Sequence, residues 1–289
     1  MNPKALLLAV GLVSLSFANL SRAQVVFSDT FSATNTFNIN ENLGSPRQTG
    51  TYITANPGGV AWNEYANPAG GIPDNLTQLG NTYPNTMNLF PNPAQKVYLA
   101  VRTAADFSSD LNLVSEYDIT FNQRVVYGGS NTGWLQFSFG ATNSVGDDFT
   151  PLFPNQATAG FSVIFEADGS FQSWSSGTPV ATGTITLSGG DFQAIRFNVQ
   201  NTGSDAIIRM YANGVEELSY TRTGGFGAGE GHLIFGGFTS GGDNAFNYNA
   251  VQNLAVTVVP EPSAFALLVG FGCGLMLMRR MRRERPLTH

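Results

Sequence analysis

The amino-acid sequence predicts an all-β protein whose body is an antiparallel β-sandwich. Short stretches of alternating apolar and polar residues recur about every 8 to 12 residues, with Gly, Asn, Asp or Ser turns between them. Residues typical of strands and turns are abundant, with 33 glycines and 22 phenylalanines among 289 residues. No stretch of the body shows the sustained apolar period of about 3.6 residues that a helix requires.

The first 23 residues have the three parts of a secretory signal peptide. Lys4 supplies the positive charge, Ala5 to Phe17 form the apolar core, and Ser21-Arg22-Ala23 is a small-x-small cleavage site. We therefore expect cleavage between Ala23 and Gln24, so that the mature chain begins at Gln24.

The N-terminal half of the body contains fewer regular strand signals than the C-terminal half. The strands predicted there are Val25 to Phe31, Lys96 to Arg102, Leu113 to Gln123 and Gly133 to Gly140. Between Ser45 and Pro93 the chain has seven prolines and many Asn and Gly residues. This composition predicts long loops that cross an end or a face of a sheet, and such loops often carry the binding function of a sandwich.

Hairpin signals are clearest in the C-terminal half. Tight turns are predicted at Asp168-Gly169, Asn201-Thr202-Gly203 and Asn213-Gly214. The strands that these turns connect, and the two that follow, are 161–165, 171–174, 194–199, 205–212, 215–221, 232–238 and 250–258. The sequence thus predicts one hairpin and then three consecutive antiparallel strands.

Three short motifs resemble those of concanavalin-like, or laminin-G-like, jelly rolls. They are the opening Val26-Phe27-Ser28-Asp29-Thr30-Phe31, the hairpin Tyr211-Ala212-Asn213-Gly214-Val215, and the closing strand from Val251 to Val256. A closing Asp-Asn pair typical of that family is Gln252-Asn253 in this chain. The resemblance implies a jelly-roll sandwich for residues 24–258.

The C-terminus has three parts in a fixed order. They are the motif Val259, Pro260, Glu261, Pro262 and Ser263, the apolar run 264–278, and a cluster formed by Arg279, Arg280, Arg282, Arg283 and Arg285. The prolines must end any strand that reaches them. A helix over the 15-residue run would be about 22 Å long, which is short for a bilayer. The arginine cluster nevertheless favours a transmembrane helix with a cytoplasmic stop over a core helix.

These three parts resemble the PEP-CTERM sorting signal of Gram-negative bacteria. The resemblance implies recognition by an exosortase, an integral-membrane cysteine protease that would cleave near the motif. The expected path is export through the inner membrane, a membrane-anchored precursor, and then the cell surface or the exopolysaccharide matrix. The chain thus divides into a signal peptide (1–23), an exported domain (24–258) and a sorting signal (259–289).

Composition excludes several classes of function. Cys273, the only cysteine, lies in the predicted membrane segment, so the body has no disulfide and no thiolate nucleophile. His232 is the only histidine outside the tail, which excludes a histidine-rich metal centre. Residues 24–259 carry 18 acidic and 7 basic side chains, a net charge of −11. This acidic body would repel nucleic acid phosphates, so we expect no nucleic acid partner.

A candidate catalytic motif begins at Glu116. Laminarinase-type glycoside hydrolases, which have the concanavalin-like fold, carry Glu-x-Asp-x-x-Glu on one strand, and alternation would place Glu116 and Asp118 on one face here. The position of the acid/base residue is Phe121, so half of the hydrolytic machinery is missing. The sequence therefore assigns no catalytic residue and predicts a solvated strand face. His232 is expected to be a hydrogen-bonded strand residue rather than a base.

Two kinds of ligand contact remain as candidates. Trp62, Tyr65 and Tyr83 in the proline-rich region could stack on sugar rings, and Trp62 is expected to be exposed, whereas Trp134 and Trp174 are expected to be buried. The loop residues Asp147, Asp148 and Asp243 are candidate Ca²⁺ ligands, although they lack the spaced acidic pattern of a readable site and also suit ordinary turns. No cofactor other than this calcium is predicted.

The favoured interpretation is a non-enzymatic, exported protein with an adhesive or glycan-binding role. Its expected partners are an exosortase, extracellular polysaccharide, and the membrane through the C-terminal helix. Two alternatives remain open. One is a glycoside hydrolase or lyase that acts on polysaccharide from a jelly-roll fold, and the other is a purely structural component of the matrix.

Overall fold

The computed structural model describes residues 23–32, 39, 47–50, 61–68, 77–79, 84–89, 97–126, 133–142, 153–186, 192–239 and 248–259. One compact unit extends from Val25 to Val258. The predicted signal peptide before Ala23 and the sorting signal after Val259 lie outside the described residues, so both stay predictions. In the described part of the chain, no helix is long and apolar enough to cross a membrane.

Two sheets form the layers of this unit. Sheet A contains β1 (Gln24–Asp29), β2 (Gln48–Thr49), β4 (Thr77–Leu79), β5 (Met87–Leu89), β7 (Glu116–Val126), β12 (Gln193–Asn201), β13 (Asp205–Ala212), β14 (Val215–Thr223) and β16 (Tyr248–Val258). Sheet B contains β3 (Trp62–Pro68), β6 (Val97–Thr103), β8 (Gly133–Thr142), β9 (Phe161–Glu166), β10 (Ser170–Ser175), β11 (Thr178–Thr184) and β15 (Glu230–Thr239). Two short helices, α3 (Ser108–Leu111) and η2 (Ala157–Ala159), lie in connections.

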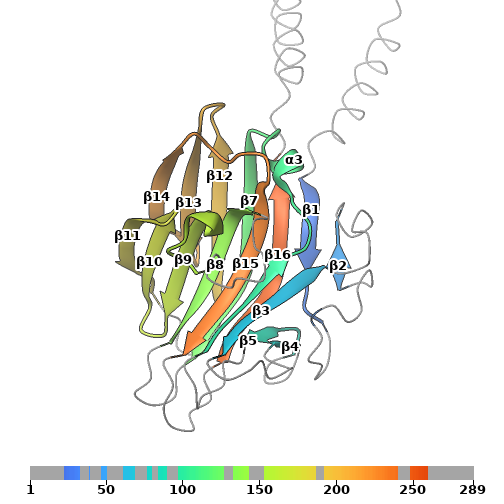
Figure 1. Ribbon diagram of the computed structural model, residues 1–289, viewed down its shortest axis with the longest axis vertical. Coiled ribbons are helices and arrows are strands. Elements are labelled where there is room, and N and C mark those ends of the chain that lie inside the picture. The colour runs from blue at the N-terminus through green and yellow to red at the C-terminus, as the bar shows by residue number, and fades with distance from the viewer. Residues whose placement is uncertain are drawn as a thin grey trace, which may run out of the picture. The chain divides into compact units, whose positions relative to one another are not determined.

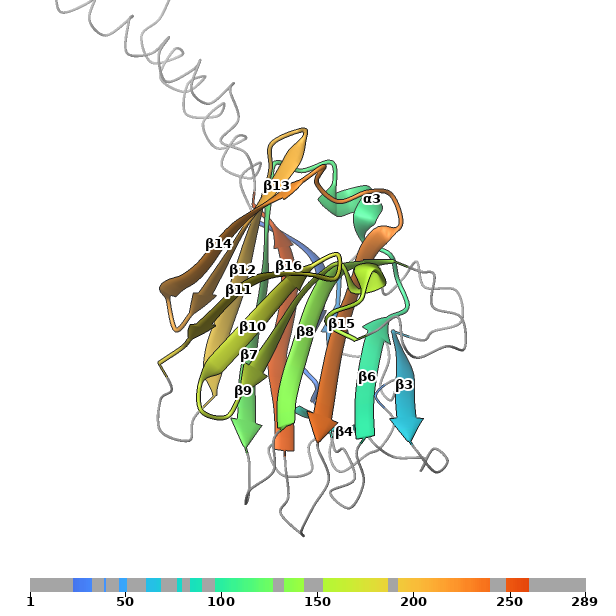
Figure 2. The ribbon, with the colours of Figure 1, turned by 60° about the vertical axis from the view of Figure 1, so that its left-hand side comes forward.

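The strand order confirms the predicted antiparallel sandwich. Sheet A runs β14-β13-β12-β7-β16-β1-β2, with β5 also paired to β16 and β4 to β5. Sheet B runs β11-β10-β9-β8-β15-β6-β3. Figures 1 and 2 show the two sheets as layers that face each other, with β14 of one sheet and β11 of the other along the same side.

The predicted hairpins are present. Asp168-Gly169 joins β9 to β10, where Gly169 has φ +89° and the Asp168 carboxylate accepts the Ser170 N–H at 2.8 Å. Asn213-Gly214 joins β13 to β14 with φ +50° and +85°, a pair of values that Asn and Gly adopt with little strain. The three consecutive antiparallel strands β12, β13 and β14 are likewise confirmed.

The prediction of long loops between Ser45 and Pro93 is wrong in part, because β2, β3, β4 and β5 lie there. Strand β11, which the sequence did not indicate, is a second omission. Both β3 and β11 are edge strands of sheet B, and both contain a proline. An edge strand has one side without ladder hydrogen bonds, so it tolerates proline where a central strand would not.

Aromatic side chains fill the space between the sheets. Phe121 of β7 lies 4.6 Å from Phe137 of β8 and 5.1 Å from Phe235 of β15, measured between ring centroids. The second contact is edge-to-face at 89°, an arrangement that aromatic quadrupoles favour. Phe139, Phe161 and Phe197 extend the same cluster. The body is therefore held by a continuous apolar core.

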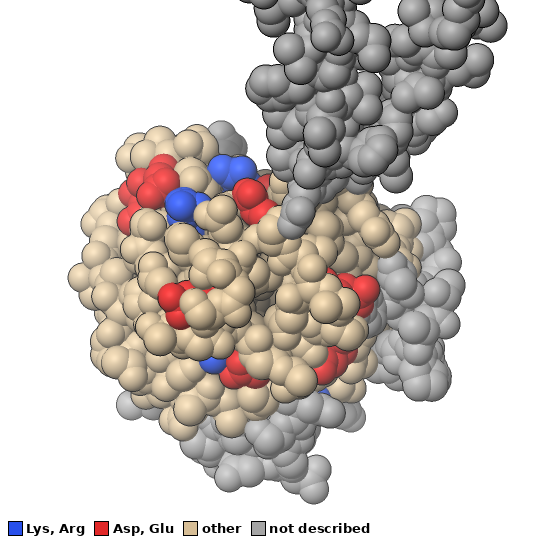
Figure 3. Space-filling model, turned by 90° about the horizontal axis from the view of Figure 1, so that it is seen from above, with Lys and Arg blue, Asp and Glu red and all other residues tan. Residues whose placement is uncertain are grey.

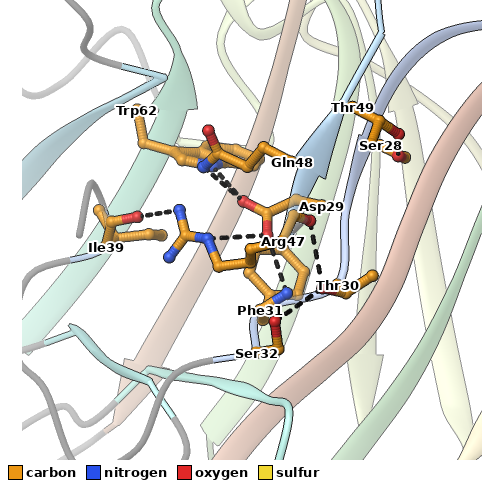
Figure 4. Close-up of polar contacts among 10 residues, drawn as sticks. All are labelled: Ser28, Asp29, Thr30, Phe31, Ser32, Ile39, Arg47, Gln48, Thr49 and Trp62. Carbon is orange, nitrogen blue, oxygen red and sulfur yellow. Dashed lines mark hydrogen bonds and ion pairs between the residues drawn. The ribbon is translucent and has the colours of Figure 1, made fainter. Parts of the chain in front are cut away.

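A buried carboxylate joins the N-terminal strands to the opposite sheet (Figure 4). Asp29 Oδ1 accepts the Phe31 N–H at 2.8 Å and lies 3.4 Å from Arg47 Nε, while Oδ2 accepts Gln48 Nε2 and Trp62 Nε1, each at 3.0 Å. The Asp29 and Arg47 side chains are both 0% exposed. Burial raises the pKa of Asp29, and Arg47 with the N–H donors offsets part of that rise.

The expectation that Trp62 is exposed for glycan contact is wrong. Its side chain is 1% exposed, and its ring packs near Phe27, Phe31 and Phe235. Trp62 starts β3 at the edge of sheet B, so its ring turns into the core and its N–H finds Asp29. A buried indole N–H needs such a partner.

We expect Trp62→Phe to lower the free energy of unfolding by about 1 to 3 kcal/mol, because it removes a hydrogen bond to a buried charged group. Urea denaturation would measure the loss. Trp174→Phe is the matched control, since the Trp174 side chain is only half-buried and donates no hydrogen bond to the described residues. Equal losses in the two variants would contradict a stabilising role for the bond to Asp29.

Candidate functional site

The outer face of sheet A carries the candidate site. Along β7, Tyr117, Ile119 and Phe121 are buried and face the other sheet. Because successive side chains alternate, Glu116 and Asp118 face outward, and both are half-buried. The prediction that these two carboxylates share one face is therefore confirmed.

Asn198 of the neighbouring strand β12 holds both carboxylates. Its Nδ2 donates to Glu116 Oε1 at 2.7 Å and to Asp118 Oδ1 at 2.9 Å. Asn198 lies directly opposite Asp118 in the register of β12 and β7 and is 6% exposed. Its Oδ1 accepts Arg209 Nη1 at 3.5 Å. One amide thus fixes two acidic side chains and is itself oriented by a third strand.

Arg196 and Tyr211 extend this network along the same face. The Arg196 guanidinium carbon lies 4.1 Å from the centre of the Tyr211 ring, and its Nη1 is 3.7 Å from Asp118 Oδ2. Tyr211 Oη donates to Glu216 Oε2 at 3.1 Å. Partial burial, together with the Glu216 carboxylate, raises the pKa of Tyr211. The phenol therefore stays protonated at neutral pH and presents a ring and a hydroxyl side by side.

A pocket of about 380 Å³, here called the sheet A pocket, opens between these strands. Its polar lining comes from Thr120, Asn122, Arg196, Tyr211 and Asn253. Within the described residues, the side chains of Thr120, Asn122 and Asn253 make no hydrogen bond to other protein groups. The pocket therefore offers neutral donors and acceptors beside a cation and an aromatic ring. Its volume falls in the range of small-molecule sites.

The site lacks the proton donor that glycoside hydrolysis requires on this strand. The residue at the acid/base position, Phe121, is 2% exposed and packs in the core, facing away from Asp118. Glu116 and Asp118 are held by an amide rather than by a protonated carboxyl group. Retaining hydrolysis needs one carboxylate and one acid, and Phe121 supplies no acid at the third position of the motif.

His232 does not take part in this site. Its Nδ1 lies 2.8 Å from the Thr103 carbonyl oxygen, and the ring is buried at the start of β15. Burial lowers the pKa of His232, so the imidazole is neutral at pH 7. The prediction of a hydrogen-bonded strand residue is confirmed.

The remaining candidate residues lie apart from the site or outside the described residues. Tyr65 lies opposite Ala100 in the register of β3 and β6, but its side chain is outside the described part. Tyr83, Asp147, Asp148 and Asp243 are outside it altogether, so the glycan and calcium predictions for them stay predictions. Within the described ranges, no group of three or more His, Cys, Asp or Glu residues could hold a metal ion.

Sequence reasoning missed Asn198, Arg196, Arg209 and Tyr211. Alternation along β12 and β13 places them on one face, but only the pairing of β12 with β7 brings them to the carboxylates. Glu116 and Asn198 are 82 residues apart in the chain. No local pattern specifies a contact over that separation.

Comparisons with known proteins found structural similarities but no match in sequence. No family model matches the chain, and no curated protein matches it either. The structure is similar to an endo-1,3-β-glucanase from Streptomyces sioyaensis, with TM-score 0.50 and 12% identity, over 81% of this chain and 96% of that one. Lectin II from Ulex europaeus gives TM-score 0.44 at 10% identity over 68% and 92% of the two chains. The Emp46p carbohydrate recognition domain gives 0.48 at 11% over 68% and 88%.

At these identities the likeness to the glucanase concerns the fold alone. It agrees with the two antiparallel sheets described above, and the predicted jelly-roll sandwich is confirmed at that level. What the pocket binds depends on the residues of this chain.

We expect Asn198→Asp to destabilise the protein by about 2 kcal/mol at pH 7, because two carboxylates lose their donor and gain a third negative charge. The loss should shrink in about 1 M NaCl, because salt screens the repulsion between the three negative charges. Urea unfolding at pH 7, in low salt and in about 1 M NaCl, measures both values. Asn122→Asp, about 13 Å further along β7, is the matched control. A loss that is equal at the two salt concentrations would contradict the electrostatic role of Asn198.

Proposed function

We propose that this chain is an exported, non-enzymatic protein of the cell surface or extracellular matrix, and that it contacts glycans through the sheet A pocket. The main support for this proposal is the set of side chains that line that pocket. Thr120, Asn122 and Asn253 provide neutral polar groups next to the Tyr211 ring, and within the described residues these groups make no hydrogen bond. Sugar hydroxyls donate and accept hydrogen bonds, and the apolar faces of sugar rings pack on aromatic side chains.

Charge on the body also favours a carbohydrate over a strongly charged partner. The acidic net charge of residues 24–259 is spread over many separate side chains. In the view of Figure 3, most of the described surface is neither acidic nor basic, and the carboxylates lie in small separate groups. The described part of the face in that view shows no extended cationic patch for a polyanion such as nucleic acid.

The two ends of the chain support the proposed localisation. A secretory signal before Gln24 and a PEP-CTERM-like tail after Val258 would send the chain through the inner membrane and present it to an exosortase. The apolar run 264–278 would anchor the precursor, with the arginine cluster on the cytoplasmic side. Processing near Pro260-Glu261-Pro262 would then pass the domain to the cell surface or matrix.

A hydrolase or lyase is the second candidate function, because Glu116 and Asp118 do lie on the outer face beside the pocket. We rank it below binding since the two carboxylates share one amide and Phe121 replaces the acid. Calcium bound in a loop would be compatible with either role.

Tyr211→Ala should reduce glycan binding by about tenfold, equivalent to ~1.4 kcal/mol, because it removes both the ring and the support of Arg196. A glycan array probed with the mature protein from Gln24 onwards would identify the sugar, and calorimetry would measure the affinity. Thr221→Ala, an exposed change on the outer side of edge strand β14, is the control.

Equal binding by the two variants would place the glycan contact elsewhere. If the unmodified protein bound no glycan, the purely structural role would replace this proposal. Release of reducing ends from a polysaccharide, abolished by Glu116→Gln, would replace it with the hydrolase.

Glu261→Ala should block C-terminal processing and leave the tagged precursor in the membrane of a host that has its exosortase, because the proposed protease reads the Pro-Glu-Pro motif. Immunoblots of membrane and culture fractions would detect the two forms. Glu284→Ala removes the other tail carboxylate and should leave processing unchanged. Processing of the Glu261 variant at the normal rate would rule out this use of the motif.

A further inference from the structure

The three tryptophans of the chain differ in their burial and in their contacts. Trp62 is buried and donates to Asp29, and Trp134 stacks on Phe238 at 5.4 Å. Trp174 on β10 is half-buried, and within the described residues it makes no hydrogen bond and no ring contact. A large aromatic side chain that reaches the surface with a free indole N–H is suited to ligand contact.

Trp174 lies on the outer face of sheet B, opposite to the sheet A pocket. It pairs with Ser162 of β9, whereas the neighbouring Ser173 pairs with Val163, which faces the core. On the other side, Gln172 pairs with Thr182 of β11, and Trp174 pairs with Pro179. Edge strand β11 thus leaves Trp174, Gln172 and Thr182 in one outward-facing row.

The centre of the outer face of sheet B is covered by side chains of the protein itself. Phe153 stacks on Tyr98 at 4.4 Å, and Tyr98 Oη donates to Gln136 Oε1. Gln136 Nε2 in turn donates to Ser138 Oγ, and both of these polar side chains are fully buried. The part of the face that stays accessible around Trp174 is therefore the strip formed by β10 and β11.

A bulge fixes the backbone beside Trp174. The register of β10 and β11 shifts between Ser173 and Trp174. Ser173 Oγ bridges this point, since it donates to the Ala181 carbonyl oxygen at 3.1 Å and accepts the Ala181 N–H at 3.2 Å. Bulges of this kind redirect one side chain and hold it there. Trp174 is thus held in place with only part of its side chain exposed.

The result is a pocket of about 310 Å³, here called the Trp174 pocket. Its lining consists of Gln172, Ser173, Trp174, Pro179, Val180, Ala181 and Thr182, with no acidic or basic side chain. The side chains of Gln172 and Thr182 form no hydrogen bond to other described residues. An indole next to an unpaired amide and an unpaired hydroxyl matches the alternating apolar and hydroxyl surfaces of a neutral sugar.

We propose that the Trp174 pocket is a second glycan-contact site, specific for uncharged sugar units. Because the two pockets lie on the outer faces of opposite sheets, one molecule can bind two polysaccharide strands at once and bridge them. This inference rests on the proposed glycan-binding function and adds a second site, its sugar class and the bridging role. A charged sugar is disfavoured because no lining side chain can pair with it.

Affinity electrophoresis of the mature protein through gels that contain a neutral β-1,3-glucan, a neutral galactomannan or an anionic alginate tests the site. We expect Trp174→Ala to weaken retention by a neutral polysaccharide about tenfold, equivalent to ~1.4 kcal/mol. Trp174→Phe keeps a ring and should lose less. Thr184→Ala, an exposed change at the other end of β11, is the matched control. Urea unfolding of each variant checks that the fold is intact.

Bridging is measured separately, by light scattering of dilute polysaccharide with added protein. The unmodified protein should increase the scattering, and either Trp174→Ala or Tyr211→Ala should abolish the increase while leaving one site able to bind. If Trp174→Ala changed neither retention nor scattering while Tyr211→Ala reduced retention, the second site would be refuted and the proposed function would stand. If no gel retained the unmodified protein, both proposals would fail.

Discussion

The structure depends on the strict alternation of side chains along strands that enclose an aromatic core. Ile119 and Phe121 of β7 pack against the opposite sheet, so Asp118 and Thr120 must face outward. A shift of one residue in the pairing of β7 would exchange these two sets, burying carboxylates and exposing phenylalanine. The packing that stabilises the fold therefore also determines which side chains the outer faces present.

The Asp29 cluster imposes a second constraint, on the side of the sandwich where the strands are shortest. β2 has only two residues, and β3 is an edge strand. The Asp29 carboxylate compensates for this limited strand pairing, because it accepts hydrogen bonds from Gln48 of β2 and Trp62 of β3 at once. These two bonds join sheet A to sheet B. Burying a carboxylate costs free energy, as the raised pKa of Asp29 reflects. The buried Asp29 side chain is therefore stable only while all its hydrogen-bond donors are in place. The N-terminal strands are thus specified by these polar contacts as well as by buried apolar side chains such as Phe27.

Much of the fold was predictable from local sequence. The features that were not predictable depend on strand pairing between distant parts of the chain. Turns such as Asn213-Gly214 follow from backbone conformation, which two residues encode. Strands β3 and β11 were not predicted because each contains a proline. An edge strand tolerates proline since one of its sides has no neighbouring strand, and the local sequence does not reveal that a strand lies at an edge. Trp62 was misplaced for the same reason. The site around Asn198 needed the β12 to β7 pairing, which no local pattern contains.

Two modest sites on opposite faces suit a polymer better than one strong site would. A polysaccharide repeats the same unit, so a molecule that has bound one strand meets a high local concentration of further sites. Each pocket can then be shallow and built from neutral side chains, as the linings around Thr120 and Trp174 are. In a membrane-anchored precursor the same geometry would tie polysaccharide to the envelope. After C-terminal processing it would link strands within the matrix, so the proposed cleavage would change what the domain connects without changing either pocket.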